Sequence, residues 1–360
     1  MKKVKIGQIG LGDIAQIRYM PCYKRSDFNF ILNAMCTRNE QKLKKYAREF
    51  NLDSTYTDYK EMLKNADIDA VVITTNTQSH FDITMECIKA NKHVLLEKPM
   101  AITLKETNQM IKAAENRGIK FMPLPYDDQK SLEETRRILS EGSLGKIVSM
   151  EATATHDGAK NADWFYKKGS GILNDMAIYP ISWFTGFAGP AIEVSAFSSI
   201  LIPYREIATG QRVKVENEDS CSIMLKWQNG ILATISSNWA TNGIGKNFVN
   251  GIWRGNALMN ARIYGTQGII YCDYVPNRIT LISENIKSNS YKIAEIEYLK
   301  GLREDFTQSK FSDNTWGGPE IITSFCDTIL NDTKVPTNLD QARHVIEIIE
   351  KAYKSIRTCC

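Results

Sequence analysis

Short apolar runs alternate with helical stripes over the first 125 residues. Strands are predicted from the runs at 4–9, 28–35, 70–73, 93–96 and 119–122. Helices are predicted from apolar residues at spacings of three and four, over 13–22, 43–50, 81–88 and 104–117. Thr103 and Glu106 form a capping box before the last helix. Strand and helix in alternation predict a parallel sheet with helices on both faces, which binds ligands at the carboxyl ends of its strands.

The pattern changes after residue 125. A helix is predicted over 131–141, and alternating apolar and polar residues then predict strands at 147–155, 220–227, 231–239, 259–264, 268–273 and 278–283. Gln228-Asn229-Gly230 predicts a hairpin turn between two of them. Helices at about 319–330 and 339–356 follow. We predict a Rossmann domain over 1–124 and an α+β domain over 125–360, with a largely antiparallel, open-faced sheet for substrate binding and oligomerisation.

Composition narrows the possible functions. The 360 residues are 43% hydrophobic and 24% charged, with a net charge of +4 and no basic block, which argues against disorder and nucleic-acid binding. No apolar run reaches the ~18 residues of a membrane span, and we expect no signal peptide in the first residues, because they lack an apolar stretch of the required length. Eight cysteines without a CxxC pair argue against a metal site. A cytoplasmic protein without metal is expected.

A glycine motif follows the first predicted strand. Gly10-Leu11-Gly12-Asp13-Ile14-Ala15 reads GxGxxA and opens a helix. The first glycine permits a tight turn, the second lets the backbone approach a pyrophosphate, and Ala15 permits close helix packing. Amides at the start of the helix, from Asp13 and Ile14, would face the phosphates. The motif predicts dinucleotide binding, with a purely structural turn as the alternative.

The end of the second strand bears on the choice of cofactor. NAD enzymes usually place a carboxylate there, but this chain has Thr37 and Arg38, with Lys42 one turn later. A guanidinium pairs bidentately with a 2′-phosphate, which favours NADP over NAD. The alternative is that Arg38 is a solvated residue at a helix start.

Two further motifs carry chemistry. Glu97-Lys98-Pro99 ends the fifth strand, where Lys98 suits proton exchange with a substrate hydroxyl; the alternative is a surface ion pair with Glu97. The segment 169–180, GSGILNDMAIYP, opens with glycines and continues as a helix. Asp175 and Tyr179 in it are four residues apart and share one helical face, so the carboxylate can orient the phenol. A structural helix face is the alternative.

These motifs, in this order, resemble the glucose-fructose oxidoreductase, inositol dehydrogenase and rhizopine-catabolism (Gfo/Idh/MocA) family. The resemblance covers nearly the whole chain, including TNTQSH at 75–80 and the hairpin segment 216–230. It implies that Lys98 is the catalytic lysine, with Asp175 and Tyr179 beside the substrate. It also implies that Thr75, Asn76, His80 and Glu97 belong to the cofactor side.

Details of the motifs bear on the substrate. Tyr179 stands where many family members have His, and resembles the aldose and dihydrodiol dehydrogenases of the family. The segment 123–128 lacks the family's usual arginines, and Ser170 and Ala177 replace two glycines. We expect the substrate side to include Tyr126, His156, Trp164 and Asn174, with core packing as the alternative for the aromatic residues.

The leading hypothesis is an NAD(P)-dependent oxidoreductase that transfers hydride between nicotinamide and a sugar, polyol or related carbonyl compound. One alternative is a glycoside-cleaving or epimerising enzyme that recycles a tightly bound NAD. Another is a non-catalytic dinucleotide sensor. The resemblance implies a homodimer or homotetramer through the open sheet face, because exposed apolar surface favours burial against another subunit.

Overall fold

The computed structural model describes residues 2–125, 130–159, 163–240, 248–249, 252–253, 258–273, 278–283, 294–295 and 318–358. The chain divides into two compact units. Unit 1 comprises Met1–Tyr126 and Gln308–Ile346, and unit 2 comprises Asp127–Thr307 and Glu347–Cys360. The predicted domain boundary at 124/125 places the whole C-terminal part in the second domain. In the structure, α9 (Gly318–Leu330) belongs to unit 1.

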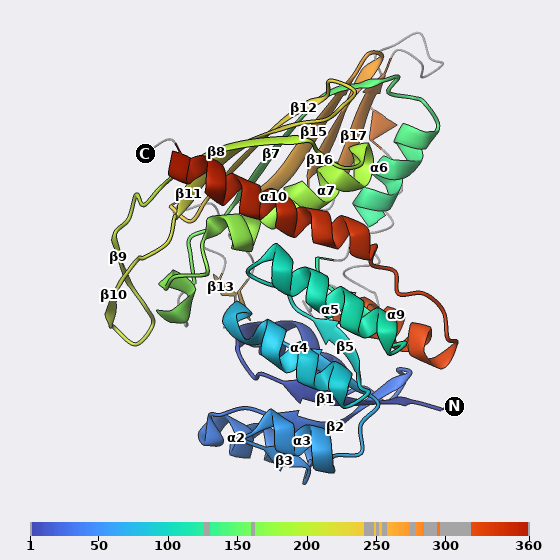
Figure 1. Cartoon of the computed structure of the whole chain (residues 1–360), viewed down its shortest axis with the longest axis vertical. Coiled ribbons are helices and arrows are strands. Elements are labelled where there is room, and N and C mark those ends of the chain that lie inside the picture. The colour runs from blue at the N-terminus through green and yellow to red at the C-terminus, as the bar shows by residue number, and fades with distance from the viewer. Residues whose placement is uncertain are drawn as a thin grey trace. The chain divides into compact units, whose positions relative to one another are not determined.

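Unit 1 is built on a six-stranded sheet in the order β3-β2-β1-β4-β5-β6 (Figure 1). All neighbouring strands are parallel. The strands are β1 (Val4–Ile9), β2 (Phe30–Cys36), β3 (Thr55–Tyr56), β4 (Ala70–Ile73), β5 (His93–Leu96) and β6 (Phe121–Pro123). This order is that of a doubly wound, dinucleotide-binding sheet, so the predicted Rossmann fold is confirmed.

Helices cover both faces of this sheet because alternate strand residues point to opposite sides. Ala70 and Val72 join one buried cluster, whereas Val71 and Ile73 join the other. The first cluster contains residues of η1 (Ala15–Tyr19), α1 (Met20–Tyr23), α2 (Glu40–Phe50) and α9. The second contains residues of α3 (Tyr59–Asn65), α4 (His80–Lys89), which follows η2 (Thr77–Ser79), and α5 (Leu104–Asn116).

Helix α9 belongs to unit 1 because its apolar stripe completes the first cluster. Ile322 and Phe325 are fully buried there, in the same cluster as Tyr19 and Phe30. A Cβ at Gly318 would collide with the carbonyl of Arg18, so the start of α9 lies directly against η1. The short η1 and α1 segments therefore share their sheet face with a helix from the end of the chain.

Unit 2 is built on an eight-stranded sheet in the order β18-β17-β16-β15-β7-β12-β11-β8. Its neighbours are antiparallel except β12 and β7, which confirms the predicted largely antiparallel sheet. The strands are β7 (Ile147–Thr155), β8 (Glu193–Ser199), β11 (Ser220–Lys226), β12 (Leu232–Asn238), β15 (Leu258–Gly265), β16 (Gly268–Asp273), β17 (Arg278–Ser283) and β18 (Ala294–Glu295). Two small separate sheets pair β9 (Tyr204–Glu206) with β10 (Arg212–Lys214) and β13 (Phe248–Val249) with β14 (Ile252–Trp253).

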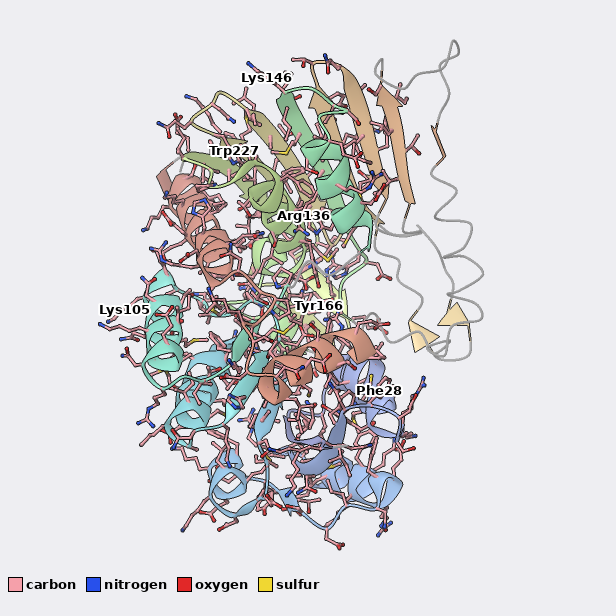
Figure 2. The ribbon with its side chains drawn as sticks, turned by 90° about the vertical axis from the view of Figure 1, so that its right-hand side faces the viewer. Phe28, Lys105, Arg136, Lys146, Tyr166 and Trp227 are labelled. Carbon is pink, nitrogen blue, oxygen red and sulfur yellow. The ribbon has the colours of Figure 1, made fainter. Side chains whose placement is uncertain are left out.

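Helices lie along one face of the large sheet (Figure 1). They are α6 (Lys130–Ser140), α7 (Ile178–Ala188) and the part of α10 (Leu339–Thr358) that belongs to unit 2. On α6, the guanidinium carbon of Arg136 lies 6.0 Å from the ring centre of Phe187 (Figure 2).

The two faces of the large sheet differ in burial. Along β11, Ile223 and Leu225 are buried and Met224 is exposed. Within the described ranges, every helix is too short or too polar to cross a lipid bilayer.

A buried carboxyl group joins α10 to the glycine-rich segment. The Tyr353 hydroxyl donates to Glu218 Oε1 at 2.7 Å, and the Leu173 amide lies 3.4 Å from the same oxygen. Burial raises the pKa of the Glu218 carboxyl, although these hydrogen bonds oppose the rise. A Cβ on Gly171, which has φ +109°, would collide with this carboxyl group. Glycine is therefore required where the segment passes Glu218.

Replacing Glu218 by Gln is expected to change the pH dependence of stability. Because the folded state raises the pKa of Glu218, the contribution of this group to the unfolding free energy falls as pH rises from about 4.3, the ordinary glutamate pKa, through the raised value. Glu218→Gln lacks this titration, so its stability relative to wild type should increase over that interval. Urea unfolding at several pH values measures this difference.

The control is Glu216→Gln, at an exposed carboxylate two residues away. The control curve should run parallel to that of the wild type. A Glu218→Gln curve that also runs parallel would contradict the prediction.

Candidate functional site

The glycine motif forms the turn at the carboxyl end of β1. Gly10 has φ +91°, and its amide donates to Cys36 O at 2.9 Å. A Cβ on Gly10 would lie 2.8 Å from Thr74 O, so only glycine fits there. A Cβ on Gly12 would meet nothing within 4 Å. Gly12 thus faces open space beside the start of a helix, which fits the approach of a phosphate group.

A buried side-chain network fixes this turn. Gln8 is 1% exposed, and its Nε2 donates to Gly10 O at 3.0 Å and to Thr74 Oγ1 at 2.9 Å. Thr74 Oγ1 lies 2.9 Å from Gly10 O, and the Tyr23 hydroxyl donates to Gln8 Oε1 at 2.8 Å. Burial raises the pKa of Tyr23, so its hydroxyl remains a donor. The sequence analysis missed Gln8, whose signal was a polar amide in a buried strand.

The predicted helix over 13–22 contains a π turn. After Asp13 and Ile14, the π turn η1 covers Ala15–Tyr19, and α1 follows with Pro21 in its first turn. π turns occur mostly as single turns inside α-helices, and frequently at functional sites. Here the π turn presents Arg18 and Tyr19 to the lysine motif at the end of β5.

Glu97 of the lysine motif is buried and bound on both oxygens. Its Oε1 accepts from Arg18 Nη1 and from the Tyr19 hydroxyl, each at 2.9 Å. Its Oε2 accepts from the Lys98 amide at 3.1 Å. Glu97 is 5% exposed and Arg18 is 7% exposed. Glu97 is thus a buried residue and not the surface residue of the alternative interpretation. It holds the backbone of Lys98, whose side chain is partly exposed.

The end of β4 lies next to this motif in the sheet, because β4 pairs with β5. Ser79 Oγ lies 2.9 Å from Thr75 Oγ1 and 2.6 Å from Asn76 Oδ1. His80 is 1% exposed, with Nδ1 2.9 Å from Pro99 O and Nε2 3.2 Å from Thr75 O. Burial lowers the pKa of His80. The His80 ring thus lies between two loops with its nitrogens near their carbonyls, and in the neutral ring one N–H donates to one of them.

The residues predicted to choose the cofactor lie at the same sheet edge. Thr37 and Arg38 follow Cys36, whose carbonyl binds the Gly10 amide. Arg38 is exposed, and Asn39 Oδ1 caps α2 by accepting from the Lys42 amide at 2.9 Å. The carboxyl edge therefore brings together the predicted residues of β1, β2, β4 and β5.

In unit 2, Asp175 lies in the π turn η4 (Leu173–Ala177). Its Oδ2 accepts from His156 Nε2 at 2.6 Å and from Trp239 Nε1 at 2.9 Å. The Gly158 amide donates to His156 Nδ1 at 2.8 Å. Because an amide only donates, Nδ1 is the acceptor and Nε2 carries the proton given to Asp175. The sequence analysis missed Trp239, which lies 64 residues from Asp175.

The predicted shared face of Asp175 and Tyr179 is visible in the burial pattern. Throughout 171–185, every residue is buried except these two, which are partly exposed. A carboxylate and a phenol, four residues apart, are therefore the partly accessible groups of an otherwise enclosed segment.

The substrate-side predictions have mixed outcomes. Trp164, in η3 (Asp163–Tyr166), is 40% exposed and meets Phe165 edge-on at 5.8 Å. Asn174 is 5% exposed, and its amide donates to Tyr353 Oη at 3.1 Å, so its side-chain nitrogen is bonded inside the protein. Tyr126 lies outside the described residues.

Two family models match the chain. The oxidoreductase family model with an NAD-binding Rossmann fold (Gfo/Idh/MocA) matches residues 4–124, and the Gfo/Idh/MocA C-terminal domain matches 132–271. Levoglucosan dehydrogenase of Pseudarthrobacter phenanthrenivorans is 24% identical over 301 residues, covering 76% of this chain and 74% of that protein. Myo-inositol 2-dehydrogenase of Thermotoga maritima is 25% identical over 284 residues, covering 78% of each.

A solved structure shares the fold. Levoglucosan dehydrogenase in complex with NADH and levoglucosan aligns with a TM-score of 0.78 at 20% identity. The alignment covers 99% of this chain and 98% of that one.

The two glycines should respond differently to alanine. Gly10→Ala places a Cβ against Thr74 O in a conformation that alanine disfavours, so the thermal unfolding temperature should fall. Gly12→Ala meets no protein atom, so its stability should stay within about 0.5 kcal/mol of wild type. Its affinity for a nicotinamide dinucleotide, followed by fluorescence, should nevertheless fall about tenfold or more. Wild-type dinucleotide affinity in Gly12→Ala would contradict this assignment.

Proposed function

Because the chain belongs to the Gfo/Idh/MocA oxidoreductase family, we propose that it transfers hydride between a nicotinamide dinucleotide and a sugar, a polyol or a related carbonyl compound. The relatives named for levoglucosan and myo-inositol support this substrate class. One observation carries the proposal. At the carboxyl edge of the parallel sheet in unit 1, Gly12 faces open space and the buried Glu97 fixes the backbone of Lys98.

The residues at the carboxyl edge of the unit 1 sheet fit a nicotinamide dinucleotide. Gly10 and Gly12 give its pyrophosphate room, and the amides of Asp13 and Ile14 start the following helix. Thr75 and Asn76 lie at the end of β4, between the glycine turn and the lysine motif, as residues for the nicotinamide side. When bound, the dinucleotide supplies or accepts the hydride. Glu97 and His80 contribute by holding the loops that carry these groups.

NADP is the proposed preferred form, with NAD as the form that the family description names. Thr37, Arg38 and Lys42 follow β2, and the first acidic residue after the strand, Glu40, already lies in α2. An exposed guanidinium at this edge can pair with a 2′-phosphate through two hydrogen bonds.

In the proposed reaction, three side chains handle the substrate hydroxyl. Lys98 takes up the hydroxyl proton as the alcohol is oxidised and returns it in the reverse direction. Tyr179 assists this transfer, and Asp175 orients the phenol. Two N–H groups donate to Asp175 Oδ2 and fix the orientation of this carboxylate, which suits an orienting role.

The surroundings of Asp175 suit a polyhydroxyl compound. Trp164 is a large aromatic side chain with a substantial exposed surface, and such rings stack on sugars. His156 uses both ring nitrogens inside the protein, so we assign it an indirect role through Asp175. Tyr126 stays an expectation from the sequence.

The open sheet face supports a homodimer or homotetramer. Phe197 of β8, Met224 of β11 and Leu232 of β12 are 67%, 54% and 46% exposed, and these three strands are neighbours. Exposed apolar side chains on neighbouring strands favour association of identical subunits. The six described cysteines are buried free thiols, which supports a cytoplasmic location.

Replacing Lys98 by Met should remove most turnover. Loss of a general acid–base group typically costs about 10²- to 10⁴-fold in kcat. Dinucleotide affinity should persist, because the Glu97 contact uses the backbone amide of Lys98. The matched control is Lys105→Met, at an exposed lysine of α5 (Figure 2), which should keep wild-type kcat. Normal turnover in Lys98→Met, on a panel of sugars and polyols, would refute the proposed role.

Replacing Arg38 by Ser should weaken the binding of NADPH but not the binding of NADH. A charged hydrogen-bonded pair contributes about 1.5–3 kcal/mol, so NADPH affinity should fall by about 10- to 100-fold while NADH affinity is retained. Arg48→Ser, at an exposed arginine in the last turn of α2, is the control. Fluorescence titration of wild type and both variants with each cofactor makes the comparison. A wild type that prefers NADH would overturn the NADP preference but leave the oxidoreductase proposal standing.

A further inference from the structure

A buried arginine spans the two strand ends that carry the donors to Asp175. Arg205 lies in β9, outside the large sheet, and its side chain is 9% exposed. Its Nη1 donates to Asp157 O at 3.0 Å, and its Nη2 donates to Trp239 O at 2.9 Å. Asp157 directly follows His156, so one guanidinium holds the chain beside each of the two donors.

The charge of this arginine is compensated inside the protein. Asp219 is fully buried, and its Oδ2 lies 3.4 Å from Arg205 Nη2. Its two oxygens also accept from the amides of Leu201 and Ile202, at 2.7 and 2.9 Å. The planar fork of a guanidinium reaches two carbonyls and a carboxylate together, which the single ammonium group of a lysine does not.

The loop that follows His156 is packed against the same guanidinium. Gly158 has φ +85°, and a Cβ there would lie 2.6 Å from Tyr166 Oη and 2.9 Å from Arg205 Nη1. The Tyr166 ring, labelled in Figure 2, lies 5.6 Å from Arg205 Cζ, and its hydroxyl donates to Ala159 O at 2.6 Å. The amide of Gly158, which selects the tautomer of His156, is therefore located by Arg205 and Tyr166.

We propose that Arg205 is a positioning residue for Asp175. By holding Asp157 O and Trp239 O at once, it sets where His156 Nε2 and Trp239 Nε1 meet the carboxylate, and it fixes the Gly158 amide that keeps His156 in one tautomer. This assignment rests on the proposed function, in which Asp175 belongs to the substrate site.

The first test is Arg205→Lys, which keeps a positive charge opposite Asp219 but removes the double span. Misplacement of a reacting group by about 1 Å can cost about 100-fold in rate, so kcat should fall by about 10- to 100-fold. Dinucleotide affinity should not change. Arg212→Lys is the control, because Arg212 lies on the partner strand of the same small sheet, where it is exposed and packs over Tyr204 at 4.4 Å.

The second readout does not need turnover. The chain has four histidines, so the ring ¹⁵N signals of His156 are assignable by NMR. The wild type should show a single tautomer with Nε2 protonated, and Arg205→Lys should show mixed tautomers. If the wild type turns over no substrate, the proposed function fails, yet this measurement still tests the role of Arg205. Wild-type kcat, or a wild-type His156 signal, in Arg205→Lys would overturn the proposal.

A double-mutant cycle separates an action through His156 from a general loss of structure. His156→Gln keeps a donor for Asp175 but loses the ring nitrogen that accepts from Gly158. In that background Arg205→Lys should lower kcat less than it does alone, because interacting residues are non-additive. Fully multiplicative effects on kcat would contradict the proposal.

A second variant covers the case in which Arg205→Lys does not fold. The double variant Arg205→Gln with Asp219→Asn removes both buried charges together and should show the same mixed tautomers of His156. A wild-type His156 signal in that variant would overturn the proposal.

Discussion

Two hydrogen-bonded carboxylates, the buried Glu97 of unit 1 and the partly exposed Asp175 of unit 2, hold the loops on which the proposed chemistry depends. An ionised group removed from water costs several kcal/mol unless donors compensate it, so its position is determined by the donors that reach it. Glu97 binds Arg18, Tyr19 and the Lys98 amide, and thereby ties the helix after the glycine turn to the lysine motif. Asp175 binds His156 and Trp239 in the same manner. A shift of the Lys98 loop or of the helix that carries Arg18 and Tyr19 would remove donors from the buried Glu97.

Both carboxylate sites use a π turn at the start of a helix. The turn η1 precedes α1 with Pro21, and the turn η4 precedes α7 with Pro180. Proline has no N–H to donate and crowds the preceding helical turn, and a wider turn accommodates both effects. In η1 the wider turn carries Arg18 and Tyr19, which reach Glu97, and in η4 it carries Asp175 itself. Local backbone geometry thus decides which side chains reach the buried charges.

The sequence predicted the elements whose signal is local. Apolar runs identified β1, β4 and β5 at their observed bounds, and the capping box of Thr103 and Glu106 is present. Strand β8, with the sequence EVSAFSS, was missed because Phe197 directly follows Ala196 and breaks the alternation of apolar and polar residues. Helix α3 was missed because it is only seven residues long. The partners of Glu97 were missed because Arg18 is 79 residues away, a distance that no periodicity spans.

The contrast between buried, hydrogen-bonded residues and exposed residues explains why the type of reaction is easier to predict from the sequence than the choice of cofactor and substrate. Residues that fix the loops, such as Gln8, Glu97 and Asp219, are buried and bonded on several sides, so the fold specifies them strongly. Arg38 and Trp164, which we assign to cofactor and substrate, are exposed. Exposed side chains change at little cost to stability, usually within about 0.5 kcal/mol. A chain built this way can keep its reaction type while its cofactor and substrate preferences change, and this agrees with relatives that share the fold at 20–25% identity under names for different sugars and polyols.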